Sequence, residues 1–140
     1  MKTQAITYSE QSDIIFGIDF DGTIVEHEYP NIGPAVSHAI DTMKELQQKG
    51  HKLILWTMRS DEYLDEAVKY VEKQGITLFG VNTNHEQKEW TNSPKAYCQM
   101  YIDDVVLGCS LIQCGVAKRP FVDWKNVREL LVDYGGFCNY

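Results

Sequence analysis

The stretch IIFGIDFDGT, residues 14–23, decides the fold, because an apolar run delivers two carboxylates, one residue apart, into a glycine turn. A continuous apolar run is typical of a strand covered on both faces, so we expect a strand over residues 13–19. Asp19 and Asp21 follow at its end, where burial and mutual repulsion oppose ionisation of both carboxyl groups. A hard cation would relieve both penalties, since Mg2+ binds carboxylates, waters and phosphate oxygens. The stretch therefore predicts a metal site that handles phosphate groups.

The composition is that of an ordinary soluble globular chain. Its 140 residues suffice for one core, so we expect a single domain over residues 1–140, with residues 1–12 as a loosely held lead-in. The 44% of hydrophobic and 24% of charged residues exclude a disordered chain. A net charge of −7 argues against nucleic-acid binding, because such binding needs a basic surface. A phosphorylated substrate is still compatible with this net charge, because a bound metal and one or two basic residues can reverse the electric field at the site.

The distribution of apolar residues and cysteines predicts a cytoplasmic protein without membrane contact. No apolar run approaches the ~18 residues of a transmembrane helix, and the polar N-terminus lacks the apolar core of a signal peptide. The cysteines show no CxxC pair and no histidine at zinc-finger spacing. We expect reduced thiols rather than a zinc site or a disulfide at Cys98, Cys109, Cys114 and Cys138.

Strand and helix signals alternate after residue 12, which favours βαβ units and a parallel sheet. We therefore expect the α/β class, a three-layer Rossmann-like parallel sheet with helices on both faces. Apolar residues at 3–4 spacing, proline at a first helical position, capping residues and terminal glycines mark the helices. The expected strands are 13–19, 52–57, 76–81 and 100–102, and the expected helices run from Pro34 to Gly50, from Ser60 to Gly75, and onward from Asp123.

Polar groups follow three of these strands directly, at Asp19, Thr57 and Asp103. Ligands of parallel sheets bind outside the carboxyl ends of the strands, so we expect these groups to converge on one site. A carboxylate such as Asp19 can attack phosphorus and form an aspartyl-phosphate. Asp21 would then protonate the leaving oxygen and later deprotonate water.

Further residues complete this expected chemistry. Thr57 would hold the oxygens of the transferring phosphoryl group, and Lys95 would neutralise charge on the nucleophile and the phosphate. Asp103, with Asp104, would complete the metal shell. We expect the substrate to contact Thr57, Lys95 and Arg59, the last of which would meet a second anionic group.

The order and context of these residues resemble the haloacid dehalogenase superfamily over residues 13–108. The DxDGT motif of that superfamily stands at residues 19–23, and its second motif matches Thr57 after an apolar run. Its lysine is best matched by Lys95 in Ser93-Pro94-Lys95, and its acidic pair by Asp103-Asp104. Lys95 stands close before this pair, without room for a full helix between them, so Lys88 is a rival for the lysine.

This resemblance implies that Asp19 is the nucleophile and Asp21 the general acid/base. It also implies that Mg2+ is bound by the Asp19 carboxylate, the Asp21 main-chain carbonyl and an aspartate of the acidic pair. We favour Asp103 as the direct ligand, with Asp104 acting through water or on the residues around the metal. The choice between these two aspartates stays open.

The chain would be a capless member of the superfamily, because neither 22–34 nor 57–95 has room for a cap domain. Capless members act on large substrates or close the site by forming oligomers, so both a phosphorylated small molecule and a macromolecular phosphate end are candidate substrates. A homo-oligomer stays possible. The loop over residues 82–87 would face the site, and His85 has some claim on the substrate. The other histidines, including His27, are expected at the surface.

Several other interpretations compete with a phosphatase. Asp-Gly alone is a common turn. An EF-hand is excluded, because its required glycine and closing glutamate would fall on Ile24 and Pro30. A receiver domain has its acidic pair before the phosphorylated aspartate, the reverse of the order here. A metal-binding regulatory module with little turnover, and a phosphotransferase on the same scaffold, both stay open.

Overall fold

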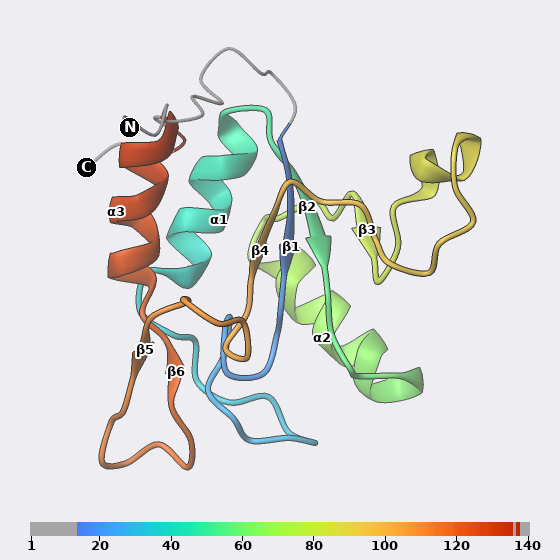
Figure 1. The fold of residues 1–140 in the computed structure, drawn as a ribbon. Helices are drawn as coiled ribbons and strands as arrows, with labels where there is room; N and C mark the ends of the chain where they lie inside the picture. Colours follow the sequence, from blue (N-terminus) through green and yellow to red (C-terminus); the bar gives the residue numbers. More distant parts are fainter. Residues whose placement is uncertain (1–13, 136, 138–140) are drawn as a thin grey trace.

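The computed structural model describes residues 14–135 and residue 137, and a parallel sheet runs through it (Figure 1). The sheet order is β3-β2-β1-β4. Ile18 at the end of β1 pairs with Leu55 of β2 on one side and with Ile102 of β4 on the other. The three strands therefore end at the same level, and the predicted α/β parallel sheet is confirmed. The strands are β1 (Ile15–Ile18), β2 (Lys52–Leu55), β3 (Gly80–Val81) and β4 (Met100–Ile102).

In the part of the chain that the structure describes, the three α-helices all lie on one face of the sheet. These are α1 (Ala39–Gln48), α2 (Asp61–Lys73) and α3 (Trp124–Gly135). Their buried side chains form one apolar cluster with strand residues that point to this face, such as Phe16 and Leu55. Right-handed crossovers from β1 to β2 and from β2 to β3 place α1 and α2 on the same side.

The other face is covered by a thinner layer than expected. Ile15 and Ile54 pack there against Ala96, and the segment between β3 and β4 contributes only a 3₁₀ helix, η1 (His85–Glu89). Tyr101 lies so close to Gly17 that a Cβ atom there would stand 2.8 Å from its ring. The helix on this face is a 3₁₀ helix instead of an α-helix, because the crossover back to β4 is short and polar.

Some predicted boundaries were also wrong. Pro34 does not begin a helix: its carbonyl accepts a hydrogen bond from the Glu26 N–H at 2.9 Å, and α1 starts only at Ala39. The third strand is reduced to Gly80–Val81. Asp123 caps α3 as predicted, since its Oδ1 accepts from the Asn126 N–H at 3.3 Å. The lead-in over residues 1–12 and Cys138 lie outside the described residues.

A hairpin that the sequence did not predict follows β4. Its strands are β5 (Leu111–Ile112) and β6 (Phe121–Val122), which pair antiparallel. The Val122 N–H donates to the Gly22 carbonyl at 2.9 Å, and the Trp124 indole N–H donates to the Thr23 carbonyl at 2.7 Å. The hairpin therefore lies beside the carboxyl ends of the strands, next to the loop that follows β1 (Figure 1).

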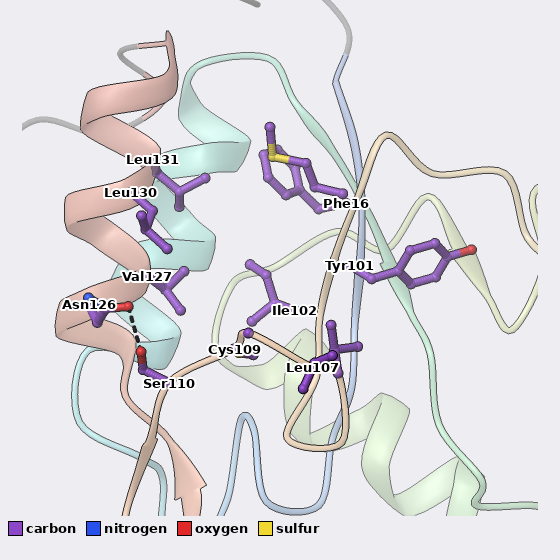
Figure 2. A pocket seen from close by; sticks show the side chains of 13 residues that line it. Phe16, Tyr101, Ile102, Leu107, Cys109, Ser110, Asn126, Val127, Leu130 and Leu131 are labelled. Carbon is purple, nitrogen blue, oxygen red and sulfur yellow. Dashed lines mark hydrogen bonds between the residues drawn. The ribbon is translucent and has the colours of Figure 1, made fainter. Parts of the chain in front are cut away.

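A cavity of about 320 Å³ lies between β4 and α3 (Figure 2). Apolar side chains such as Phe16, Ile102, Val127 and Leu131 line it, and the Ser110 hydroxyl donates to Asn126 Oδ1 at 2.9 Å. None of the predicted site residues lines this cavity. Within the described part of the chain, no helix is both long and apolar enough to cross a membrane.

Candidate active site

Three of the predicted carboxylates meet at the ends of β1 and β4. The Asp19 N–H donates to the Ile102 carbonyl at 3.0 Å, which fixes Asp19 beside the strand that leads into Asp103 and Asp104. One carboxylate oxygen from each aspartate lies within 4.8 Å of the other two. The structure thus brings together the three carboxylates that the sequence proposed as metal ligands. The Asp21 carboxylate is not part of this cluster.

Burial and crowding oppose the ionisation of this cluster. Burial, followed by the charge of Asp103, raises the pKa of Asp19 from 3.8 to about 8, although a hydrogen bond from Thr23 lowers it. Burial is also the largest cause of the raised pKa of Asp103. A divalent cation among these oxygens would offset both effects, and a cluster of carboxylate oxygens is the donor set that Mg2+ prefers.

Thr23 and His27 hold the cluster in place. The Thr23 hydroxyl donates to Asp19 Oδ2 at 2.8 Å and accepts from the Asp104 N–H at 3.2 Å. His27 Nε2 lies 2.8 Å from Asp104 Oδ2, and the two side chains are only 12% and 9% exposed. The expectation that His27 lies at the surface was wrong, because the chain after Gly22 folds back over the carboxylates.

Asp21 is held by Arg59 through two hydrogen bonds. Arg59 Nε and one Nη donate to the two Asp21 carboxylate oxygens at 2.8 Å each. The remaining guanidinium hydrogens go to backbone carbonyls, and the Arg59 residue is only 3% exposed. Those carbonyls belong to Pro30, Asn31 and Tyr63.

An arginine side chain has five N–H donors, and all five are used here. Arg59 was expected to contact a second anionic group of the substrate, and in this structure it has no donor left for that role. Its hydrogen bond with Asp21 is the main cause of its raised pKa. We therefore interpret Arg59 as a residue that positions Asp21.

Thr57 lies at the end of β2, as expected. Its N–H donates to Asn82 Oδ1 at 2.7 Å, and its hydroxyl oxygen accepts from the Arg59 N–H at 3.2 Å. The hydroxyl hydrogen can therefore point into the cavity. This is the arrangement needed to hold a phosphoryl oxygen.

These groups share one open cavity of about 420 Å³. Exposed side chains stand at its rim, including the Tyr29 ring and Met58, which is 98% exposed. The residues that line it are Asp19, Asp21, His27, Tyr29, Thr57, Met58, Arg59, Asp103, Asp104, Val105 and Arg119.

The two lysine candidates are not among the residues that line the cavity. Lys95 Nζ lies 5.9 Å from the ring centre of Tyr101, on the sheet face away from the α-helices. Lys88 is exposed on η1. His85 packs against Phe79, with ring centres 4.7 Å apart, rather than facing the carboxylates.

Arg119 is a cavity residue that the sequence did not reveal. It is exposed on the connection between β5 and β6, and it lines the cavity beside the carboxylates. Neither its neighbours in the sequence nor its spacing from the other site residues marked it. It reaches the site only because the hairpin returns to the loop after β1.

The chain is similar to a conserved protein from Bacteroides thetaiotaomicron whose structure has been solved, with a TM-score of 0.71. The two sequences are 34% identical over a match that covers 86% of this chain and 90% of that chain. No protein-family model matches the chain. No curated protein matches it either.

Proposed function

We propose that this chain, which belongs to the same family as the conserved Bacteroides thetaiotaomicron protein, is a Mg2+-dependent phosphatase of the haloacid dehalogenase type. It would hydrolyse a phosphate monoester through an aspartyl-phosphate on Asp19. The observation that carries this proposal is the meeting of Asp19, Asp103 and Asp104 in one cavity with Asp21. Such a cluster is electrostatically unfavourable without a cation, and carboxyl groups with strongly raised pKa values are typical of functional sites.

The residues present fit a magnesium ion. The Asp19, Asp103 and Asp104 carboxylates and the main-chain carbonyl of Asp21 would hold it, with water and phosphate oxygens completing the shell. When bound, the cation supplies positive charge that neutralises the carboxylates and the phosphoryl group. His27 would keep Asp104 oriented through their 2.8 Å contact.

The protein's own groups would then carry out two displacements. An Asp19 carboxylate oxygen attacks phosphorus, and the bond from phosphorus to the ester oxygen breaks. Asp21 gives a proton to that leaving oxygen and later takes one from the water that attacks the aspartyl-phosphate. Inorganic phosphate leaves and Asp19 is restored, while Thr57 holds a phosphoryl oxygen throughout.

The test is a screen of phosphate monoesters with Mg2+ present, using the wild type and Asp19→Asn. We expect turnover of at least one ester and its loss in Asp19→Asn. Asp21→Asn should lower kcat by about 10²–10⁴-fold, the usual contribution of a general acid/base. Full activity in Asp19→Asn at saturating Mg2+ would refute the mechanism.

A metal-binding regulatory module is the second candidate, favoured by one observation. Both Asp21 oxygens accept a hydrogen bond from Arg59, which leaves fewer lone pairs for proton transfer than a free carboxylate has. Mg2+ binding by the wild type together with no turnover of any ester would favour the module. Phosphate transfer to an added alcohol in place of water would instead identify a phosphotransferase.

The proposal for the substrate covers more than one class of molecule. The open cavity admits a phosphorylated small molecule or a macromolecular phosphate end, and the net charge of −7 disfavours nucleic acid. A cytoplasmic location is part of the proposal. It agrees with the absence of a disulfide at the three cysteines that the structure describes, Cys98, Cys109 and Cys114.

A further inference from the structure

We propose that Arg119, on the β5–β6 hairpin, binds the phosphate group of the substrate in this cavity, the role that the sequence assigned to Lys95. The inference rests on the proposed function and adds to it a residue and an element, the hairpin.

The lining of the cavity is mostly acidic. Four carboxylates line the cavity, and the described residues contribute two permanent cations to its lining, Arg59 and Arg119. Arg59 uses all five of its donors on Asp21 and on backbone carbonyls. The guanidinium of Arg119, by contrast, makes no hydrogen bond or ion pair with the residues that the structure describes. Its donors are therefore available to a ligand.

The hairpin is anchored to the site itself. Val122 donates from its backbone to the Gly22 carbonyl at 2.9 Å, directly after Asp21 in the chain. At the other side of the loop, Lys118 Nζ lies 2.8 Å from Glu28 Oε2. Arg119 lies between these two attachments, so the hairpin presents it to the cavity from the side of the loop after β1.

Lys95 differs from Arg119 in its position. Lys95 Nζ lies over Tyr101, which packs on Gly17 in the middle of the sheet, and Lys95 does not line the cavity. A phosphate dianion that approaches four carboxylates needs a cation from the protein in addition to the metal. A guanidinium suits this role, because its planar fork can donate two parallel hydrogen bonds to phosphate oxygens.

The experiment compares Arg119→Gln and Arg119→Lys with the wild type, at saturating Mg2+. Two readouts are needed: kcat/KM with p-nitrophenyl phosphate, and the affinity for inorganic phosphate measured by calorimetry. Lys125→Gln is the matched control, since Lys125 is exposed on α3 and does not line the cavity. Lys95→Gln tests the rival assignment, in which Lys95 binds the phosphate.

We expect Arg119→Gln to lower kcat/KM and phosphate affinity by about tenfold or more, equivalent to the loss of about one charge-assisted contact. Arg119→Lys should recover part of both, and Lys125→Gln should stay within twofold of the wild type. An unchanged phosphate affinity in Arg119→Gln would overturn the inference, as would a larger loss in Lys95→Gln. Phosphate binding that depends on Arg119 in a wild type that hydrolyses no ester would support the inference and count against the proposed phosphatase instead.

Discussion

At the scale of single residues, the glycine of the DxDGT motif is constrained by its neighbours as well as by its backbone. Gly22 has φ +86°, and a Cβ atom there would collide with the His27 imidazole and the Asp104 carboxylate. These are the groups that orient the cluster on its β4 side. A side chain at Gly22 would therefore disturb both the turn and the metal ligands.

We expect Gly22→Ala to lose Mg2+ affinity by more than tenfold and to destabilise the fold by about 2 kcal/mol or more. Calorimetric titration with Mg2+ and urea unfolding would measure the two effects. Gly108→Ala is the matched control, since Gly108 has φ +93° with no atom near its Cβ position. That variant should share the backbone strain and keep the Mg2+ affinity, and equal loss of affinity in both variants would contradict the argument.

Arg59→Lys tests whether this arginine positions Asp21. Lysine keeps the charge and loses the planar fork that holds both Asp21 oxygens. We expect kcat to fall about tenfold, or ~1.4 kcal/mol, with KM within twofold of the wild type. A raised KM with unchanged kcat would instead restore the role first expected from the sequence, a contact with the substrate.

At the scale of elements, the sequence predicted what depends on contiguous residues. The apolar run before Asp19 and the short run before Asp103 each form a strand, and strand pairing alone brings the two aspartates together. The place of Thr57 could be predicted for the same reason, because it comes after the apolar run that forms β2. Because parallel strands end at one edge of a sheet, a site at that edge can be predicted from the sequence.

The sequence could not predict what depends on loops folding over that edge. His27 and Arg119 reach the cavity through the turn at Gly22 and the hairpin, where no periodic pattern marks a contact. Lys95 was assigned from its order in the chain, and order does not determine on which face of the sheet a loop lies. Loop-borne cations are thus the least predictable part of this site.

The junction of β6 and α3 offers a prediction about how these elements support the site. The Trp124 indole is 1% exposed and donates to the Thr23 carbonyl, within the motif that carries the nucleophile. We expect Trp124→Phe to destabilise the protein by about 2–4 kcal/mol, through the lost volume and an unpaired carbonyl. Trp90→Phe, at a residue that is 66% exposed, should change the free energy of unfolding by less than about 0.5 kcal/mol in the same urea titration.

At the scale of the whole molecule, the acidic cluster couples folding to pH and to metal. Burial and mutual repulsion raise the pKa of Asp19 from 3.8 to about 8 and also raise the pKa of Asp103. Between about pH 4 and 8 these two carboxyl groups therefore bind more protons in the folded, metal-free protein than in the unfolded chain. Their contribution to the stability of the folded state falls as the pH rises through this range, because these groups lose their protons at lower pH in the unfolded chain.

We therefore expect the Tm of the protein in EDTA to fall from pH 5 to pH 8, and Mg2+ to raise Tm more at pH 8 than at pH 5. A bound cation favours ionised carboxylates, so metal binding competes with protons for the same oxygens. Thermal unfolding at several pH values, with EDTA and with Mg2+, measures both trends. Asp19→Asn removes the group with the large shift and should flatten the EDTA curve, since an amide does not titrate. If that variant keeps the slope of the wild type, the pH dependence arises elsewhere in the molecule, and Asp19 is not the carboxyl group whose ionisation opposes folding.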